Sequence, residues 1–450
     1  MLLKSMIVLG ALSGWAERGA AEEPVEAGVF VIDATPPLGS PLAYAPAKEV
    51  TSPLSCRGVV LLGKDRPIVL CAVDWIGIGN DGQQEFRESL ADAAQTPVER
   101  VAVQTLHQHG APRCDFSADR LLAPYGINDQ VFDAAFARGV IARAAEAVKQ
   151  AVDRAEPVTH LGLGQAVVEK VASNRRILGP DGKVRQMRWT SPRHPELKAL
   201  PAGTIDPLLR MISLYQGDRR LVALTYYAVH PVSHHVAEEA TAEFPGIARN
   251  ARQEATGVVH VHFSGAGGNL NAAKWNDGSP ENRQILADRM AAAMARAWET
   301  TEKTPIRAGD LGWRCVAVSL PVAPHLDEED LLKTLEDGSA SAHKRASAAS
   351  DLAWLRRCRS GDTIDVSCLR LADARVLHMP GELFVEYQLA AQKLRPELFV
   401  AVAAYGDYAP SYIGTEIAYR EGGYETRPGF TNVAPEVERV LMDAVRKLLD

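Results

Sequence analysis

The residues that could do chemistry gather at four points where an apolar stretch ends in polar residues beside glycine or proline. These points are residues 106–110 (LHQHG), 227–235 (YAVHPVSHH), 261–271 (VHFSGAGGNLN) and 377–382 (LHMPGE). In α/β proteins, sites assemble at strand ends because the loops there vary over a rigid support. One such turn is ordinary in any protein, but four in one chain favour a shared site.

The first point carries two histidines one residue apart, His107 and His109, after an apolar, β-branched run. Side chains at i and i+2 of a strand point to the same side, so the two rings would share a face. If the strand breaks at Gly110, either ring could instead turn towards a common centre. Neutral imidazole is the commonest protein ligand for transition metals, and metal-assisted hydrolysis needs such ligands beside an open coordination position. Two solvated loop histidines are the alternative interpretation.

The composition is that of a globular protein with ample material for a core: 450 residues, 46% hydrophobic and 23% charged. A net charge of -7 without a long Lys/Arg block disfavours a general nucleic-acid or anionic-membrane binder. None of the six cysteines forms CxxC, which disfavours a thiolate zinc knuckle. Pairing of Cys56 with Cys71, or of Cys358 with Cys368, is left open.

The N-terminus is typical of a secretory signal peptide, with a lysine, an apolar run over 6–12 and then small residues. We expect residues 1–21 to be this signal and 22–450 to be the exported (periplasmic or secreted) domain. No later segment reaches ~18 uncharged apolar residues, so no transmembrane anchor is expected.

Alternating patterns predict one α/β domain with a mixed β-sheet core flanked by helices and the active site at strand ends. Strands are predicted at 27–33, 56–62, 67–74, 101–106, 158–172, 208–215, 220–229, 258–263, 311–322, 363–370, 374–379 and 398–404. Helices are predicted at 86–94, 130–154, 244–254, 282–301, 327–357 with a break near 338–341, 383–393 and 435–449. Residues 177–205 form a long stretch of little periodicity, which in a compact protein is usually functional or mobile. No internal repeat is evident.

Further segments complete the set of chemical residues. They are Asn174-Arg175 after a mid-chain strand, Pro380-Gly381-Glu382 opening a helix, Tyr412-Ile413-Gly414-Thr415, and Tyr424-Glu425 at a spacing of twelve from the first tyrosine. In this order, together with HxH and His230, they resemble the catalytic domain of the neutral (non-lysosomal) ceramidases. Those enzymes are zinc amidases that cleave the amide of N-acylsphingosine. The resemblance runs from Asp33 to about Tyr424.

The resemblance implies a ligand set and catalytic roles. One Zn²⁺ would be held by His107, His230, Glu382 and Tyr412, which are acceptable zinc ligands and leave room for a water. The same resemblance implies catalytic roles at three further residues: His109 as proton donor, acceptor or water-orienting group, and Arg175 and Tyr424 as oxyanion or substrate-anchoring groups.

One departure from the family pattern concerns the reacting centre. The family's serine falls on Asn271 in the stretch GNLNAA (268–273), and an amide is not a usual nucleophile. Metal-activated water must then attack directly, with Asn271 orienting that water or donating to the oxyanion. The chain also ends at Asp450 on a helix, where full-length ceramidases continue into a β-sandwich. Both departures put ceramide in doubt as the substrate.

The sequence thus favours a zinc-dependent hydrolase of an amide, and less so of an ester, acting on an N-acyl lipid or another small N-acyl substrate. The alternative is a non-catalytic metal- and ligand-binding relative of the ceramidases. A metallophosphatase-like enzyme is a weaker third hypothesis, because such an enzyme would require more aspartate ligands and two metal ions.

Overall fold

The strands of the described chain form three main sheets, each with parallel and antiparallel pairs. The computed structural model describes residues 24–192, 194–234 and 237–450, so the predicted signal peptide lies outside the described residues. The first sheet has the order β6 (Val101–Thr105), β4 (Ile68–Val73), β3 (Ser55–Leu62), β1 (Val25–Asp33), β8 (Glu156–Val158). The second has the order β16 (Val259–Ser264), β14 (Arg219–Tyr227), β13 (Leu208–Gln216), β9 (His160–Val167), β18 (Glu302–Pro305). The third has the order β19 (Leu311–Val318), β20 (Ile364–Leu371), β21 (Ala374–His378), β23 (Phe399–Ala403).

The same topology recurs in all three sheets, although no repeat is evident in the sequence. Three strands pair antiparallel in each sheet: β1-β3-β4, β9-β13-β14 and β19-β20-β21. A helix then crosses over to a fourth strand that pairs parallel with the third, giving β4-β6, β14-β16 and β21-β23. The crossover helices are α1 (Asp81–Ala94), α5 (Glu243–Thr256) and α9 (Val385–Leu394). The repeat is therefore one of backbone pairing and not of residue identity.

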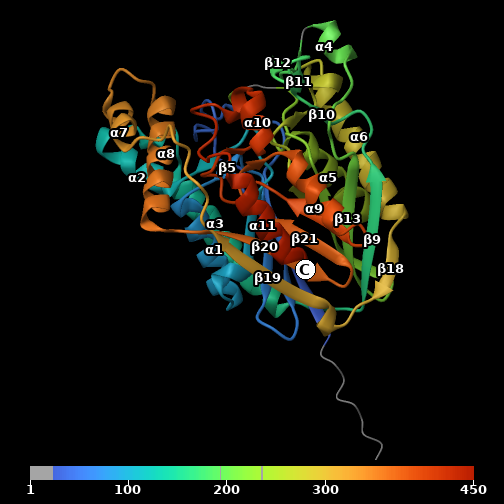
Figure 1. The fold of residues 1–450 in the computed structure, drawn as a ribbon. Coiled ribbons are helices and arrows are strands. Elements are labelled where there is room, and N and C mark those ends of the chain that lie inside the picture. The colour runs from blue at the N-terminus through green and yellow to red at the C-terminus, as the bar shows by residue number, and fades with distance from the viewer. Residues whose placement is uncertain (1–23, 193, 235–236) are drawn as a thin grey trace, which may run out of the picture.

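Helices cover the outer face of each sheet (Figure 1). Besides the crossover helices, these are α3 (Ala134–Asp153) on the first sheet, α6 (Pro280–Glu299) on the second and α11 (Val437–Leu449) on the third. The inner faces of the three sheets share one hydrophobic cluster, to which Leu70, Leu224 and Val376 each contribute from a different sheet. Each fully buried aliphatic side chain of this kind contributes roughly 1.5–3 kcal/mol. The strands are thus fixed on both faces, which makes their ends a rigid support.

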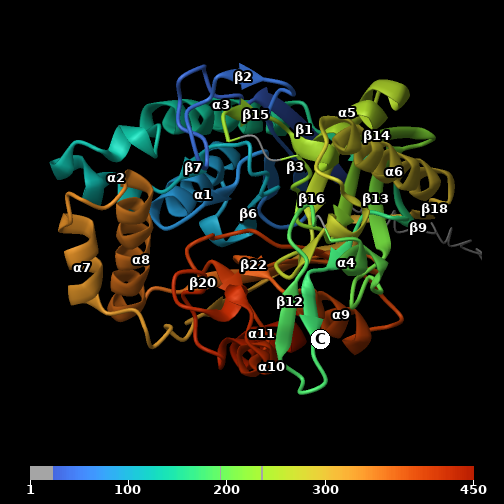
Figure 2. The ribbon, with the colours of Figure 1, turned by 90° about the horizontal axis from the view of Figure 1, so that it is seen from above.

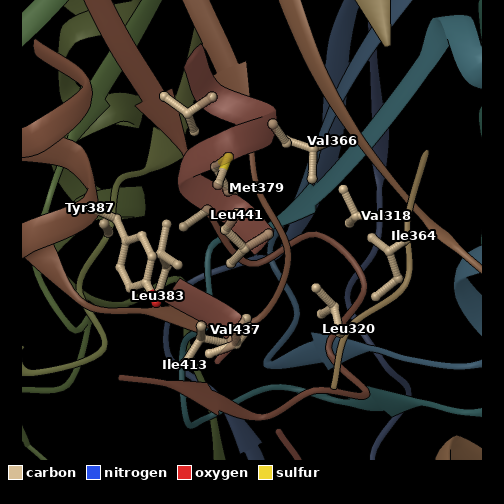
Figure 3. Close-up of a cluster of buried hydrophobic side chains, with 14 of the residues drawn as sticks. Val318, Leu320, Ile364, Val366, Met379, Leu383, Tyr387, Ile413, Val437 and Leu441 are labelled. Atoms are coloured by element: carbon tan, nitrogen blue, oxygen red, sulfur yellow. The ribbon is translucent and has the colours of Figure 1, made fainter. Parts of the chain in front are cut away.

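The apolar face of the predicted amphipathic helix α11 packs on the outer face of the third sheet (Figure 3). Val437 and Leu441 of α11 pack in one cluster with Val318, Ile364 and Val366 of the sheet. Their spacing of four places them on one helix face. The helix predicted at 435–449 is confirmed with nearly the same bounds.

A smaller helical group lies to one side of the sheets (Figures 1 and 2). It consists of α2 (Phe116–Leu122), α7 (Glu328–Glu336) and α8 (Ala342–Ser360), which share their own apolar cluster. The predicted break near 338–341 is confirmed, because Ser341 caps α8 by accepting a hydrogen bond from the backbone N–H of Lys344. This group supplies one wall of the cavity described below.

The stretch 177–205 contains more regular structure than its sequence suggests. It forms most of a hairpin of β11 (Arg176–Leu178) and β12 (Val184–Met187), followed by the short helix α4 (Pro195–Ala199). The hairpin has few alternating apolar residues because most of its side chains face solvent. The signal used to predict buried strands is therefore weak there.

Two-residue strand pairs and short helices complete the fold. The pairs are β2 (Glu49–Val50) with β15 (Glu239–Ala240), β5 (Gly77–Ile78) with β7 (Arg113–Cys114), β10 (Ser173–Asn174) with β17 (Leu270–Asn271), and β22 (Glu382–Leu383) with β24 (Tyr412–Ile413). The remaining elements are α10 (Glu416–Glu421) and single 3₁₀ turns at 98–100, 123–125, 128–130, 273–275, 308–310 and 424–426. No helix in the described ranges is both long and apolar enough to cross a bilayer.

Candidate metal centre

The carboxyl ends of the parallel strands from all three sheets meet at one place. The backbone N–H of Thr105 donates to the carbonyl of Tyr405 (2.9 Å), and that of Ala404 donates to the carbonyl of Ser264 (2.9 Å). Gly265 in turn donates to the carbonyl of Tyr227 (2.8 Å). The predicted clustering of polar strand ends is therefore confirmed.

His107 reaches the site through a turn and not from the face of a strand. The strand β6 ends at Thr105, and His107 has φ of 70°, in the left-handed region. The expectation that the two histidines share a strand face is wrong, because the extended backbone stops before them. Nδ1 of His107 donates to the carbonyl of Ile76 (2.6 Å), so Nε2 is the ring nitrogen left to face the site.

The turn brings His107, His109 and His230 together. One ring nitrogen from each lies within 4.8 Å of the others, and Nε2 of His109 is 2.8 Å from Nε2 of His230. His107 and His230 are buried. Burial and the charge of Arg175 hold the pKa of His230 well below its usual value, so its ring is neutral and can act as a ligand.

Glu382 adds a carboxylate to the three imidazoles. Its Oε2 lies 3.2 Å from Nε2 of His107 and 3.7 Å from Nδ1 of His230, and its Oε1 accepts from the hydroxyl of Tyr408 (2.7 Å). Burial raises the pKa of Glu382, but His107 and Tyr408 outweigh burial and hold that pKa below its usual value. Glu382 is thus an anion at neutral pH.

Two buried atoms of this cluster lack hydrogen bonds. Nε2 of His107 and Oε2 of Glu382 have no hydrogen-bond partner among the described residues, although both are inaccessible to solvent. Buried polar atoms of native proteins are nearly always satisfied, by protein, water or an ion. Imidazole and carboxylate donors together suit Zn²⁺. These residues therefore fit a metal ion, and the assignment of His107, His230 and Glu382 as its ligands stays a prediction.

Tyr412 lies beside this cluster, in register with Glu382 across the parallel pair of β22 and β24. Its hydroxyl is 3.2 Å from that of Tyr424. Burial and the charge of Glu382 raise the pKa of Tyr412 well above its usual value. The predicted role of Tyr412 as a metal ligand stays a prediction.

Arg175 and Tyr424 form a donor pair over the same site. Arg175 is buried and donates to the hydroxyl of Tyr424 and to the carbonyl of Gly268, and one of its nitrogens is 3.3 Å from Nδ1 of His230. Burial raises the pKa of Tyr424 to about 12, so the phenol keeps its proton and can donate it in a hydrogen bond. The predicted pair is thus brought together next to His230.

Asn271 lines the same cavity, but its amide is already bonded within the loop. Nδ2 donates to the carbonyl of Arg188 (2.6 Å), and Oδ1 accepts from the backbone N–H of Ala273 (3.2 Å). This arrangement positions the loop around β17. The predicted contact of Asn271 with a reacting water stays a prediction.

Sequence reasoning missed two tyrosines at the site. The hydroxyl of Tyr44 is hydrogen-bonded to Nδ1 of His109 (2.9 Å), and Tyr408 holds Glu382 as described above. Tyr408 follows the apolar strand 399–403, so the rule of polar residues after strand ends could have found it. Tyr44 lies in an irregular loop, and no local pattern marks it.

The cluster opens into a cavity of about 670 Å³, large enough for a small-molecule substrate. The metal-centre end is lined by His107, His109, His230, Glu382, Arg175 and Tyr424. From there the cavity extends to α8, where Ser347 and Asp351 line it. All eight residues of the predicted site, including Asn271 and Tyr412, line this one cavity.

No protein-family model matches the sequence, and no curated protein shows significant sequence similarity to it. Two solved structures do share its architecture. One is the neutral ceramidase from Pseudomonas aeruginosa, with a TM-score of 0.67 and 17% identity, covering 94% of this chain and 73% of that one. The other is a ceramidase complexed with C2, with a TM-score of 0.67 and 15% identity, covering 94% and 74%. The chain therefore has a ceramidase-like α/β fold, as the sequence predicted.

Proposed function

We propose that this protein is a zinc-dependent hydrolase of an amide bond in an N-acyl compound. The observation that carries the proposal is the cluster of three imidazoles and one carboxylate with unsatisfied buried atoms, at the end of a cavity of about 670 Å³. The ceramidase-like fold supports amide hydrolysis as the reaction class.

In this proposal the ion is held by His107, His230 and Glu382, with Tyr412 beside them. A zinc ion there would supply Lewis acidity and lower the pKa of a water nucleophile to about 7. Tyr408 fixes the carboxylate of Glu382, and the carbonyl of Ile76 fixes the ring of His107. Such outer contacts orient metal ligands and keep their lone pairs directed at the site.

The remaining residues act on the substrate. Arg175 and Tyr424 donate to the carbonyl oxygen of the amide, where negative charge develops in the transition state. His109, held by Tyr44, takes the proton from the attacking water and returns it to the leaving nitrogen. Because its Nε2 also lies among the three imidazoles, His109 needs its own test as a ligand.

The test is metal content, measured on purified protein together with turnover of a panel of fluorogenic N-acyl substrates. We expect one zinc per chain, cleavage that a chelator abolishes, and loss of the metal in His107→Ala and Glu382→Gln. His194→Ala serves as the control, because His194 is an exposed histidine whose partner within the described ranges is Glu196. Equal metal content in all variants would contradict the assignment.

His109→Ala separates the two roles of that residue. Retained zinc with lost turnover supports proton transfer, whereas lost zinc makes His109 a ligand.

The second candidate function is metal-dependent ligand binding without turnover. It is favoured by Asn271, whose amide is bonded to the loop and is no nucleophile. Stoichiometric zinc without cleavage of any acyl amide in the panel would support it.

A further inference from the structure

The cavity carries a basic group away from the metal centre, at Arg113 of β7. Nε of Arg113 is buried and has no hydrogen-bond partner among the described residues. Its guanidinium also forms no ion pair with a carboxylate of the described chain. A partly buried guanidinium without a counter-charge is unfavourable, which indicates a place for an anion.

His343, in the first turn of α8, presents a second unsatisfied atom to the same cavity. Its Nε2 is buried without a hydrogen-bond partner in the described ranges. Burial, followed by the charge of Arg113, lowers the pKa of His343, so its ring is neutral at pH 7. Two basic side chains from separate elements, each with a buried nitrogen unpartnered in the described chain, thus line the same cavity.

The metal centre opens into the same cavity. Tyr44 and Tyr408 line this cavity together with Arg113. Tyr44 is bonded to His109 (2.9 Å), and Tyr408 is bonded to Glu382 (2.7 Å). A small molecule that fills the cavity can therefore reach both the metal centre and Arg113.

We propose that Arg113 forms a subsite for a carboxylate of the substrate, in the cavity that His343 also lines. This inference rests on the proposed function and gives it a substrate class, namely acyl amides that carry a carboxylate. A planar guanidinium binds a carboxylate with two parallel hydrogen bonds. Hydrolysis of such an amide consumes one water, breaks the C–N bond, and leaves a carboxylic acid and an amine.

Binding to the metal-free protein tests the subsite without any need for turnover. The probes are N-octanoylglycine and its neutral amide, N-octanoylglycinamide, measured by titration calorimetry. A charge-assisted hydrogen bond contributes about 1.5–3 kcal/mol, so we expect at least a roughly tenfold preference for the carboxylate. Arg113→Gln should remove that preference, and Arg113→Lys should restore part of it.

The matched control is Arg66→Gln, which removes the same charge from an exposed turn outside the cavity. It should bind both probes as the wild type does. Thermal unfolding of each variant shows whether it is folded. Equal affinity of folded Arg113→Gln and wild type for N-octanoylglycine would overturn the subsite.

Turnover by the zinc-loaded enzyme then separates this inference from the proposed function. The substrates are N-octanoylglycine, N-octanoylglycinamide and the mono-ethylamide of octanedioic acid. A higher kcat/KM for the first substrate places the carboxylate on the amine part, and a higher value for the third places it on the acyl part. Equal cleavage of the neutral amide, unaffected by Arg113→Gln, overturns the subsite and leaves amide hydrolysis standing. Cleavage of none of the three, with the binding preference intact, overturns hydrolysis and leaves the subsite standing.

Discussion

His107 shows how one backbone conformation decides the chemistry of a side chain. With φ of 70° the chain turns out of β6, and Nδ1 donates to the carbonyl of Ile76 while Nε2 faces Glu382. A left-handed conformation at a residue other than glycine is unfavourable by roughly 1–2 kcal/mol. Such strain persists only where the surroundings hold it, and it concentrates at functional sites. Here the backbone N–H of His107 is held by the carbonyl of Trp75 (3.0 Å).

Tyr424→Phe removes one hydroxyl from the site and leaves the ring. We expect unchanged zinc content and a fall in kcat of about 10²–10³-fold, the usual effect of losing one donor to a developing oxyanion. Metal analysis and steady-state kinetics on the same preparation measure both quantities. Tyr125→Phe, outside the cavity, is the matched control and should keep full activity. A Tyr424→Phe variant as active as this control would exclude Tyr424 from the mechanism.

The burial of Asp351 on α8 predicts that the unfolding free energy of the protein depends on pH. Burial raises its pKa to about 6, opposed only by the amide of Asn432, which donates to Oδ1 (2.7 Å). The folded state thus favours the neutral carboxyl of Asp351 more than the unfolded state does. The stability that this neutral carboxyl contributes is complete below pH 3.8 and is lost as the pH rises through about 6.

Asp351→Asn keeps an acceptor for Asn432 and cannot ionise. Relative to wild type, it should gain about 3 kcal/mol in unfolding free energy above pH 7, because the pKa of Asp351 rises from 3.8 to about 6 and one pKa unit represents 1.36 kcal/mol. That gain should vanish near pH 4. Urea unfolding at both pH values measures it, and a gain independent of pH would contradict the assigned ionisation.

At the scale of elements, glycine permits the close approach of helices to sheets. A Cβ on Gly28 of β1 would lie 1.9 Å from the backbone oxygen of Ala151 on α3. On the second sheet, a Cβ on Gly164 of β9 would lie 2.0 Å from the oxygen of Ala297 on α6. In the first and second sheets, a glycine in the first strand of the repeated topology therefore lets a covering helix pack closely.

Gly28→Ala should accordingly destabilise the protein by about 1–3 kcal/mol or more, because backbone atoms must move apart. Gly139 lies inside α3 itself, where the nearest atom to an added Cβ is the guanidinium of Arg143 at 3.5 Å. Gly139→Ala should therefore stabilise by up to about 1 kcal/mol through helix propensity. Chemical unfolding of the two variants measures the change in unfolding free energy that each substitution causes. Destabilisation by both substitutions, or by neither, would refute the packing argument.

At the scale of the whole molecule, the proposed metal centre joins the three sheets. His107 follows β6 of the first, His230 follows β14 of the second, and Glu382 follows β21 of the third. An ion held by all three would tie together strand ends that also meet through hydrogen bonds and packing.

Zinc should therefore stabilise the whole fold and not one segment. At a free concentration 100-fold above Kd, a ligand of the folded state adds about 2.7 kcal/mol. We expect a single unfolding transition that zinc shifts to higher temperature in wild type and in His194→Ala, but not in His107→Ala. Scanning calorimetry checks this expectation, and an equal shift in His107→Ala would place the zinc elsewhere.

The local pattern of the sequence was enough to predict most of the elements. The hairpins at 56–74, 208–229 and 363–379, and the helices on their outer faces, follow from periodicity and turn residues, which act over a few neighbours. Polar residues at the strand ends, and their order along the chain, were enough to predict that His107, His230 and Glu382 belong to one site.

Tertiary structure alone decided the rest, because those features depend on contacts between segments far apart in the chain. The threefold topology lies in hydrogen-bond pairing, which side-chain identity does not reveal. The turn at His107, the tyrosine that holds His109, and the shared cavity of Arg113 and His343 likewise have no local signal. Periodicity reports which face of an element is buried, whereas the position of one side chain against another is set only when the sheets pack.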